Sequence, residues 1–152
     1  MGAAACAQQS EAQHATCVIN TCADWCGWEH MLQSPHIERL HAHVTSPKEN
    51  KAAVKVALLS RLPAIASFVA TTFDSAAAAG QQRPCIAILC DGAGTSAAVA
   101  VAAALPLLLP ALDVWGLRDA SAAAPVTKGD VRRVLANVSA LPRSRALSLS
   151  LD

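Results

Sequence analysis

The sequence has no tyrosine and only five aromatic residues, and it carries little charge of either sign. Charged residues make up 15 % of the 152 residues and the formal net charge is +1, which excludes a strongly basic nucleic-acid module but leaves room for a local cationic patch. Hydrophobic residues make up 53 %, so the chain is too apolar to be disordered throughout. The length suggests one domain. Alanine is abundant, and because it fits either face of any element it weakens every periodicity argument.

We expect no secretory signal, because residues 1–16 lack both a basic start and an apolar run. We expect residues 1–15 to be a flexible tail, residues 16–152 to be the domain, and the location to be cytoplasmic. The six cysteines are then reduced, small hydrophobes. The uncharged run from Gly92 to Leu112 has the length of a membrane span. Its glycines, prolines and alanines favour a helix buried against a sheet instead, and we expect no membrane partner.

Short apolar or alternating runs predict three strands, at 17–21, 40–44 and 85–90. The last is apolar on both faces, as in a central parallel strand. A helix is predicted to open after the charged segment 48–51, with one face formed by Val54, Leu58 and Leu59. Pro63 is unfavourable inside a helix, so it is predicted to begin a second helix that Ser60 caps and whose stripe is Leu62, Ile65, Phe68 and Val69. Residues 76–82 are predicted to form a loop.

The second half of the chain predicts two further helices. The first follows the turn after residue 90 and ends near Pro106. The second begins at a capping box with Thr127 as N-cap and Asp130 three residues later, and Leu141 and Pro142 end it. Its inner face is predicted to be Val131, Val134, Leu135 and Val138, with Arg132 and Arg133 pointing outward. Strands alternate with helices, which predicts an α/β fold with a small, mostly parallel sheet flanked by helices.

The strongest candidate for a site is the turn that follows the strand at 85–90 and enters a helix. Backbone N–H groups and the positive end of a helix dipole there suit a phosphate. The predicted phosphate-binding loop is Cys90, Asp91, Gly92, Ala93, Gly94, Thr95 and Ser96. A second interpretation stays open, in which the two glycines simply permit a tight turn that binds nothing.

The same turn has the layout of a cysteine-dependent phosphatase without its chemistry. Cys90 takes the position of the nucleophile, but Ser96 stands where the phosphatase signature has an arginine, and Leu89 stands where it has a histidine. Without the arginine, nothing lowers the thiol pKa or stabilises the charge of the transition state. The expectation is phosphatase architecture without phosphatase activity, and Cys90 is not assigned as catalytic.

Other clusters have simpler interpretations. The segment Trp25–Trp28 resembles a thioredoxin site but lacks the second cysteine. The spacing of Cys17, Cys22, Cys26 and His30 does not match a standard zinc knuckle, so we predict no metal site. Four cations near loops are candidates for phosphate contacts with RNA, namely Lys48, Lys51, Arg143 and Arg145.

Taken in order, these segments resemble a known family. The segments are the Val-Ile-Asn strand, the strand that ends in a Pro-Lys loop, Leu62–Val69, the Ile-Leu-Cys-Asp-Gly turn with its Ala-Val helix, Val126–Leu135 and Pro142–Ala146. They resemble the C-terminal, dual-specificity-phosphatase-like domain of the initiator tRNA phosphoribosyl transferases. The resemblance covers roughly residues 16–151, and its most specific part is the Thr-Lys-x-x-Val-Arg-Arg helix start followed by Pro-Arg-Ser-Arg-Ala.

The resemblance implies a function that the residues alone do not. The family transfers phosphoribosyl from phosphoribosyl diphosphate to a ribose 2′-hydroxyl of initiator tRNA, which keeps that tRNA out of elongation. The implied partners are initiator tRNA and a transferase domain in cis or in trans, and no cofactor is expected to bind this domain. The family's large N-terminal domain has no counterpart in the sequence, and Arg143 interrupts the family's Pro-Ser-Arg. A catalytically inactive, phosphatase-like interaction protein is the alternative.

Overall fold

The computed structural model describes residues 15–21, 37–42, 51–81, 84–89, 96–109, 125–141 and 146–150. The described strands form one sheet in the order β2-β1-β3-β4. Three of them run parallel, whereas the last is antiparallel to its neighbour. The strands are β1 (Cys17–Asn20), β2 (Glu38–His41), β3 (Cys85–Leu89) and β4 (Ala146–Ser150). This confirms the α/β class and the small, mostly parallel sheet.

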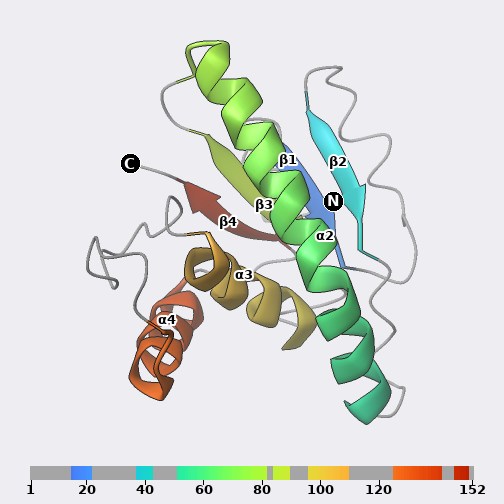
Figure 1. Cartoon of the computed structure of the whole chain (residues 1–152), viewed down its shortest axis with the longest axis vertical. Coiled ribbons are helices and arrows are strands. Elements are labelled where there is room, and N and C mark those ends of the chain that lie inside the picture. The colour runs from blue at the N-terminus through green and yellow to red at the C-terminus, as the bar shows by residue number, and fades with distance from the viewer. Residues whose placement is uncertain are drawn as a thin grey trace, which may run out of the picture.

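The core lies between this sheet and the helices α2 and α3, with α4 packed on α3 (Figure 1). Ile19, Ile86 and Ile88 alternate along β1 and β3 and join the helix-covered core, each no more than 1 % exposed. Val18 and Ala87 lie on the opposite face and are buried as well. The two central strands are therefore apolar on both faces, as a parallel sheet requires.

Helix α2 spans Lys51–Ala78 without a break, so the prediction of a new helix at Pro63 is wrong. The Ser60 hydroxyl donates to the Ala57 carbonyl, 2.8 Å away, inside the same helix and caps nothing. One stripe of α2 packs towards the sheet on both sides of the proline. It consists of Leu58, Leu62, Ile65, Val69, Thr72 and Ala76, half-buried at its first two positions and buried at the rest. Burial along this stripe outweighs the one backbone hydrogen bond that proline removes.

The predicted loop at 76–82 is also wrong, since α2 continues through three of its residues. The helix ends where Gly80 adopts a φ of +78°. The Gly80 N–H donates to the Ala77 carbonyl at 3.0 Å, and the Gln81 N–H donates to the Ala76 carbonyl at 2.9 Å. These two bonds form a Schellman cap, which favours glycine at the left-handed position. The alanine run was compatible with helix or loop, and the glycine marks the true end.

Helix α3 spans Ser96–Leu108 and is buried nearly all round, which confirms the predicted helix against the sheet. It passes through Pro106, where it was predicted to end, and stops two residues later. Helix α4 spans Lys128–Ala140 and has the predicted capping box at Thr127. Val134 and Val138 are buried as predicted, but Val131 and Leu135 are each 38 % exposed. The inner face of α4 is therefore narrower than predicted.

The strand boundaries differ slightly from those predicted, and one strand was missed. β2 begins two residues earlier than expected and ends at His41, whereas β1 and β3 each stop one residue early. β4 pairs Leu89 with Ala146 and Cys85 with Ser150 along the free edge of β3. Its Leu-Ser alternation is typical of an edge strand, but the run is too short to be distinguished from a loop.

One helix of the described part, Lys55–Ala78 of α2, is long and apolar enough to cross a membrane by length and composition. This segment is not the one that the sequence singled out. It contains Lys55, Arg61 and Asp74, and one stripe of it packs on the sheet, whereas 17 % of its apolar stretch is buried.

Candidate functional site

Four residues form a row across the sheet at the carboxyl edge of the parallel strands. Asn20 pairs with His41 on one side and with Leu89 on the other, and Leu89 pairs with Ala146. The three parallel strands thus end at one level, and β4 begins there. Groups that follow these strand ends along the chain start from neighbouring points in space.

The strand order reverses between β1 and β3. From β1 the chain passes to β2 on one side, and from β3 it passes to β4 on the other. Open α/β sheets place ligands at such a switch point, beyond the carboxyl ends of the strands. Helix α3 begins at Ser96, seven positions after the last residue of β3, so its N-terminus is fed directly from this edge. Helix N-termini in general offer N–H groups and a positive dipole end that suit an anion, which is the basis of the prediction made for this loop.

Polar groups are buried at the end of β1. Asn20 is 1 % exposed and Thr21 is 4 % exposed. The Ala42 N–H donates to the Asn20 carbonyl at 2.8 Å and ties the end of β2 to the end of β1. A buried polar side chain costs free energy unless its hydrogen bonds are satisfied. The two buried polar residues therefore distinguish this edge of the sheet from the apolar core around it.

The predicted site residues lie mostly outside the described residues. This applies to Cys90, Asp91, Gly92, Ala93, Gly94 and Thr95 of the loop, and to Lys48, Arg143 and Arg145 among the cations. Ser96 is the first residue of α3 and Lys51 is the first residue of α2. The structure therefore describes the frame around the predicted loop, and the loop's own geometry remains a prediction.

The opposite edge of the sheet is held by Thr16. Its N–H donates to the Cys85 carbonyl at 2.7 Å, and its hydroxyl oxygen accepts from the Cys85 N–H at 2.9 Å and from the Gln81 Nε2 at 2.8 Å. One side chain thus links the start of β1, the end of α2 and the start of β3. These bonds fix the register of the two strands that flank the switch point.

Cys17 is not a nucleophile. It is fully buried on β1, and burial raises the pKa of its thiol to about 12, with smaller contributions from Cys85 and Glu38. A thiol that stays protonated at neutral pH neither attacks phosphorus nor binds a metal readily. Its role is that of a small core hydrophobe, as the sequence predicted for this residue. Among the residues that the structure describes, no group of three or more His, Cys, Asp or Glu side chains is placed to hold a metal ion.

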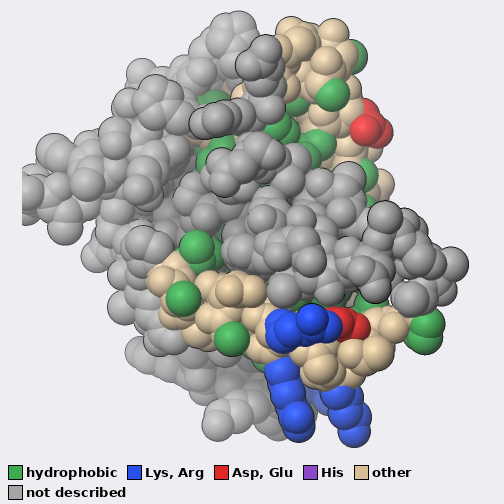
Figure 2. Space-filling view, turned by 90° about the vertical axis from the view of Figure 1, so that its left-hand side faces the viewer, with side chains coloured by type: hydrophobic (Ala, Val, Ile, Leu, Met, Phe, Trp, Pro, Cys, Tyr) green, Lys and Arg blue, Asp and Glu red, His purple; other side chains and the backbone are tan. Residues whose placement is uncertain are grey.

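A cationic surface that the sequence analysis did not assign lies on α4. Lys128, Arg132 and Arg133 are exposed, and Figure 2 shows Lys and Arg side chains gathered on the lower part of that face. Arg133 donates to Asp130 at 2.6 Å. The hydrogen bonds from Thr127, followed by this pairing, hold the pKa of Asp130 below its ordinary value. The spacing of Lys128 and Arg132, four residues apart on a helix, was the available signal in the sequence.

No family model, no curated protein and no solved structure matches the chain.

Proposed function

We propose that this chain is the phosphatase-like module of a tRNA-modifying enzyme that transfers phosphoribosyl from phosphoribosyl diphosphate to a 2′-hydroxyl of initiator tRNA. The observation that carries the proposal is the pairing of Leu89 with Ala146. It brings together the strand end from which the loop at Cys90 continues and the strand start that Arg145 precedes. The segments predicted to form the phosphate loop and the RNA contacts therefore depart from adjacent points of the frame.

The topology supports the phosphatase-like part of the proposal. A central strand at a switch point leads within seven residues into a buried helix, and a long helix precedes that strand. The role proposed for the loop is to hold a phosphate of the RNA backbone rather than to cleave one. Because Ser96 stands in the arginine position, purified protein is expected to hydrolyse aryl phosphates no faster than buffer does. Turnover that Cys90→Ser abolishes would overturn this assignment.

RNA binding by this domain is expected to be weak. Lys48, Lys51, Arg143 and Arg145 provide at most four cationic contacts, and each phosphate contact contributes a log–log salt slope of about −0.7 to −0.9. Recognition of a helical stem depends on shape and on 2′-hydroxyls more than on base edges. The domain alone should therefore discriminate poorly between initiator and elongator tRNA. No cofactor is assigned to it, and a transferase domain in cis or in trans would supply the chemistry in the cytoplasm.

Fluorescence anisotropy with labelled initiator tRNA at low salt tests the proposal. Changing Arg143 and Arg145 together to alanine should weaken binding and flatten the salt slope by roughly one to two units. The matched control changes Arg39 and Arg61 to alanine, which removes the same charge from exposed positions of β2 and α2. Equal losses of tRNA affinity in the two variants would show that binding follows net charge alone. Such a result would contradict the assignment of Arg143 and Arg145 as RNA contacts.

The alternative is a catalytically inactive, phosphatase-like interaction protein. The observation that favours it is the exposure of Val56 and Leu59 on α2, at 66 % and 57 %. Absence of tRNA binding at low salt would place this alternative ahead of the RNA-modifying function.

A further inference from the structure

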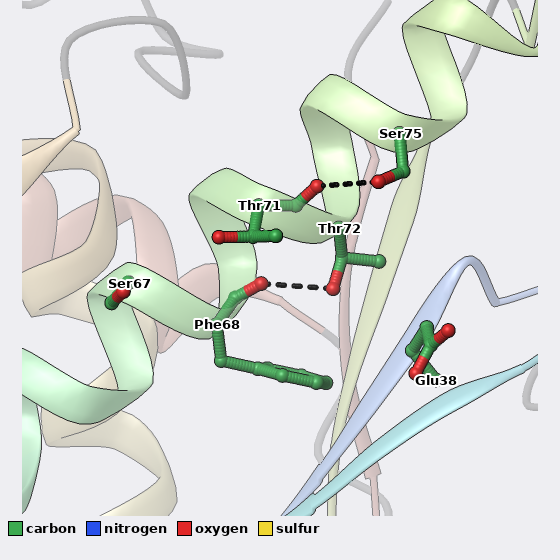
Figure 3. A pocket seen from close by; sticks show the side chains of 6 residues that line it. All are labelled: Glu38, Ser67, Phe68, Thr71, Thr72 and Ser75. Atoms are coloured by element: carbon green, nitrogen blue, oxygen red, sulfur yellow. Dashed lines mark hydrogen bonds between the residues drawn. The ribbon is translucent and has the colours of Figure 1, made fainter.

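A cavity of about 310 Å³ lies between the second half of α2 and the start of β2. Figure 3 shows its walls, which consist of Glu38, Ser67, Phe68, Thr71, Thr72 and Ser75. Glu38 is the first residue of β2, whereas the proposed phosphate loop follows the carboxyl ends of the strands. The cavity is therefore a separate site at the other end of the sheet, and an inference about it does not depend on the proposed function.

Two of the four hydroxyl groups on the α2 wall, those of Thr72 and Ser75, have their hydrogens engaged inside the helix. The Thr72 hydroxyl donates to the Phe68 carbonyl at 2.8 Å, and the Ser75 hydroxyl donates to the Thr71 carbonyl at 3.0 Å. Each hydroxyl has one hydrogen and two lone pairs, so these two groups have used their donors within the helix. Thr72 is 7 % exposed and lies at the buried side of the cavity wall.

The other two residues of the cavity wall, Phe68 and Glu38, also present negative charge or an electronegative surface. Figure 3 shows the ring of Phe68 extending from α2 towards Glu38. The face of an aromatic ring is electronegative, and Glu38 adds a carboxylate. Among the residues that the structure describes, no lysine, arginine or histidine lines the cavity and Glu38 makes no ion pair. A carboxylate, a ring face and acceptor lone pairs together match a ligand that is cationic and donates hydrogen bonds.

We propose that this cavity binds a primary alkylammonium group. The ammonium donates one N–H bond to the Glu38 carboxylate and another to the hydroxyl oxygen of Thr72, while its methylene groups cover the ring of Phe68. Cation–π attraction and a charge-assisted hydrogen bond favour the ammonium over a neutral alcohol of the same size. Both a free aliphatic amine and the side chain of a lysine in a peptide carry this chemistry.

Amide chemical shifts of the full chain, followed by NMR during titration with n-butylammonium and, separately, with a peptide that contains one lysine, test the proposal. Saturable shifts are expected at residues 67–75 and at Glu38. A tighter affinity for the peptide identifies a peptide lysine as the source, and a tighter affinity for butylammonium identifies a free amine. Butanol and butyrate, which lack the ammonium, should move these resonances at least tenfold less at the same concentration.

Two variants of equal charge change separate the site from general electrostatics. Glu38→Gln keeps the shape of an exposed side chain and should weaken binding at least tenfold. Asp74→Asn removes the same charge from an exposed position of α2 that does not line the cavity, and it should leave binding unchanged. Phe68→Leu should weaken binding less than Glu38→Gln. Absence of saturable shifts with either ligand, full binding by Glu38→Gln, or equal losses in both charge variants would overturn the proposal.

Discussion

Helices α2 and α3 share an apolar composition but differ in charge and in environment. Both are rich in alanine, valine and leucine, both contain a proline, and neither has an acidic residue in its first turn. Yet Val101 and Leu105 of α3 are fully buried, while Val56 and Leu59 of α2 are more than half exposed. α3 packs closely on α4 and also contacts α2 and the sheet, whereas the main contacts of α2 are with β1, β2 and α3.

Coverage here follows the charge of the helix, because α3 has no charged residue and is buried nearly all round, whereas α2 carries Lys51, Lys55, Arg61 and Asp74 and is buried along one stripe. The burial on α2 is confined to a stripe that faces the sheet, and it leaves the other sides of a membrane-length helix open. α3 runs between the sheet and α4, so small side chains such as Ala98 and Ala102 are buried completely. The following predictions test how strongly stability follows this contrast.

The largest effect is expected from truncating one leucine in each helix. Leu105→Ala in α3 should lower the free energy of unfolding by about 3 kcal/mol, because it removes a fully buried side chain and leaves a cavity. Leu59→Ala in α2 makes the same chemical change at a position that is 57 % exposed, and the change should stay within about 0.5 kcal/mol. Denaturation by urea measures both. Similar losses at the two positions would show that α2 is covered in solution.

The two prolines give the next contrast. Pro63 is exposed in the middle of a continuous helix, so Pro63→Ala should stabilise the protein by about 1 kcal/mol or more, since interior proline costs roughly 3 kcal/mol against alanine before the entropy of the unfolded chain is counted. Pro106 is buried two residues before the end of α3 at Leu108, so Pro106→Ala gives up packing and should be neutral or destabilising. Thermal unfolding of the two variants measures the difference. A loss of stability in Pro63→Ala would mean that the proline is required where it stands.

The capping box offers a third test, because α4 is the cover that α2 lacks. Thr127→Ala removes the acceptor for the Asp130 N–H, which lies 3.2 Å from the threonine oxygen. It should lower the free energy of unfolding by about 1 kcal/mol, whereas Thr127→Ser should keep most of it. The same urea experiment measures both variants. Equal stability of the alanine and serine variants would show that this end of α4 does not hold the helix on α3.

The sequence predicted the parts of this fold that depend on local patterns. The apolar run of β3 and the Thr127 capping box appear where they were expected, and so does the buried helix after the central strand. The predicted helix break at Pro63 was wrong because the one hydrogen bond that proline removes is weak against the burial of a whole stripe of side chains. That burial depends on contacts with the sheet, which the sequence near Pro63 does not reveal. β4 was missed because its stability comes from pairing with β3, sixty residues away in the chain.

The candidate site divides in the same way. The frame was predictable, since a central strand that feeds a helix defines an edge with a known preference for anions. The cavity at Glu38 was not, because it depends on the contact between α2 and β2. Its only sequence signal is the spacing of Ser67, Thr71 and Ser75, which recur every four residues on one side of a helix.

The smallest expected effect is a difference between α4 and α2 in how their hydrogen exchange responds to low pH. The Thr127 hydrogen bonds and Arg133 hold the pKa of Asp130 below its ordinary value, so the folded state favours the ionised carboxylate. The resulting stabilisation is complete above the ordinary pKa of an aspartate and is lost as the pH falls through the lowered folded value. Lowering the pH into that range should speed amide hydrogen exchange in the first turn of α4, after correction for the intrinsic pH dependence of exchange, and leave the second half of α2 unaffected. Asp130→Asn should remove the extra response at α4. A response of equal size in α2 would mean that acid loosens the whole domain and that the charge at the start of α4 has no local role.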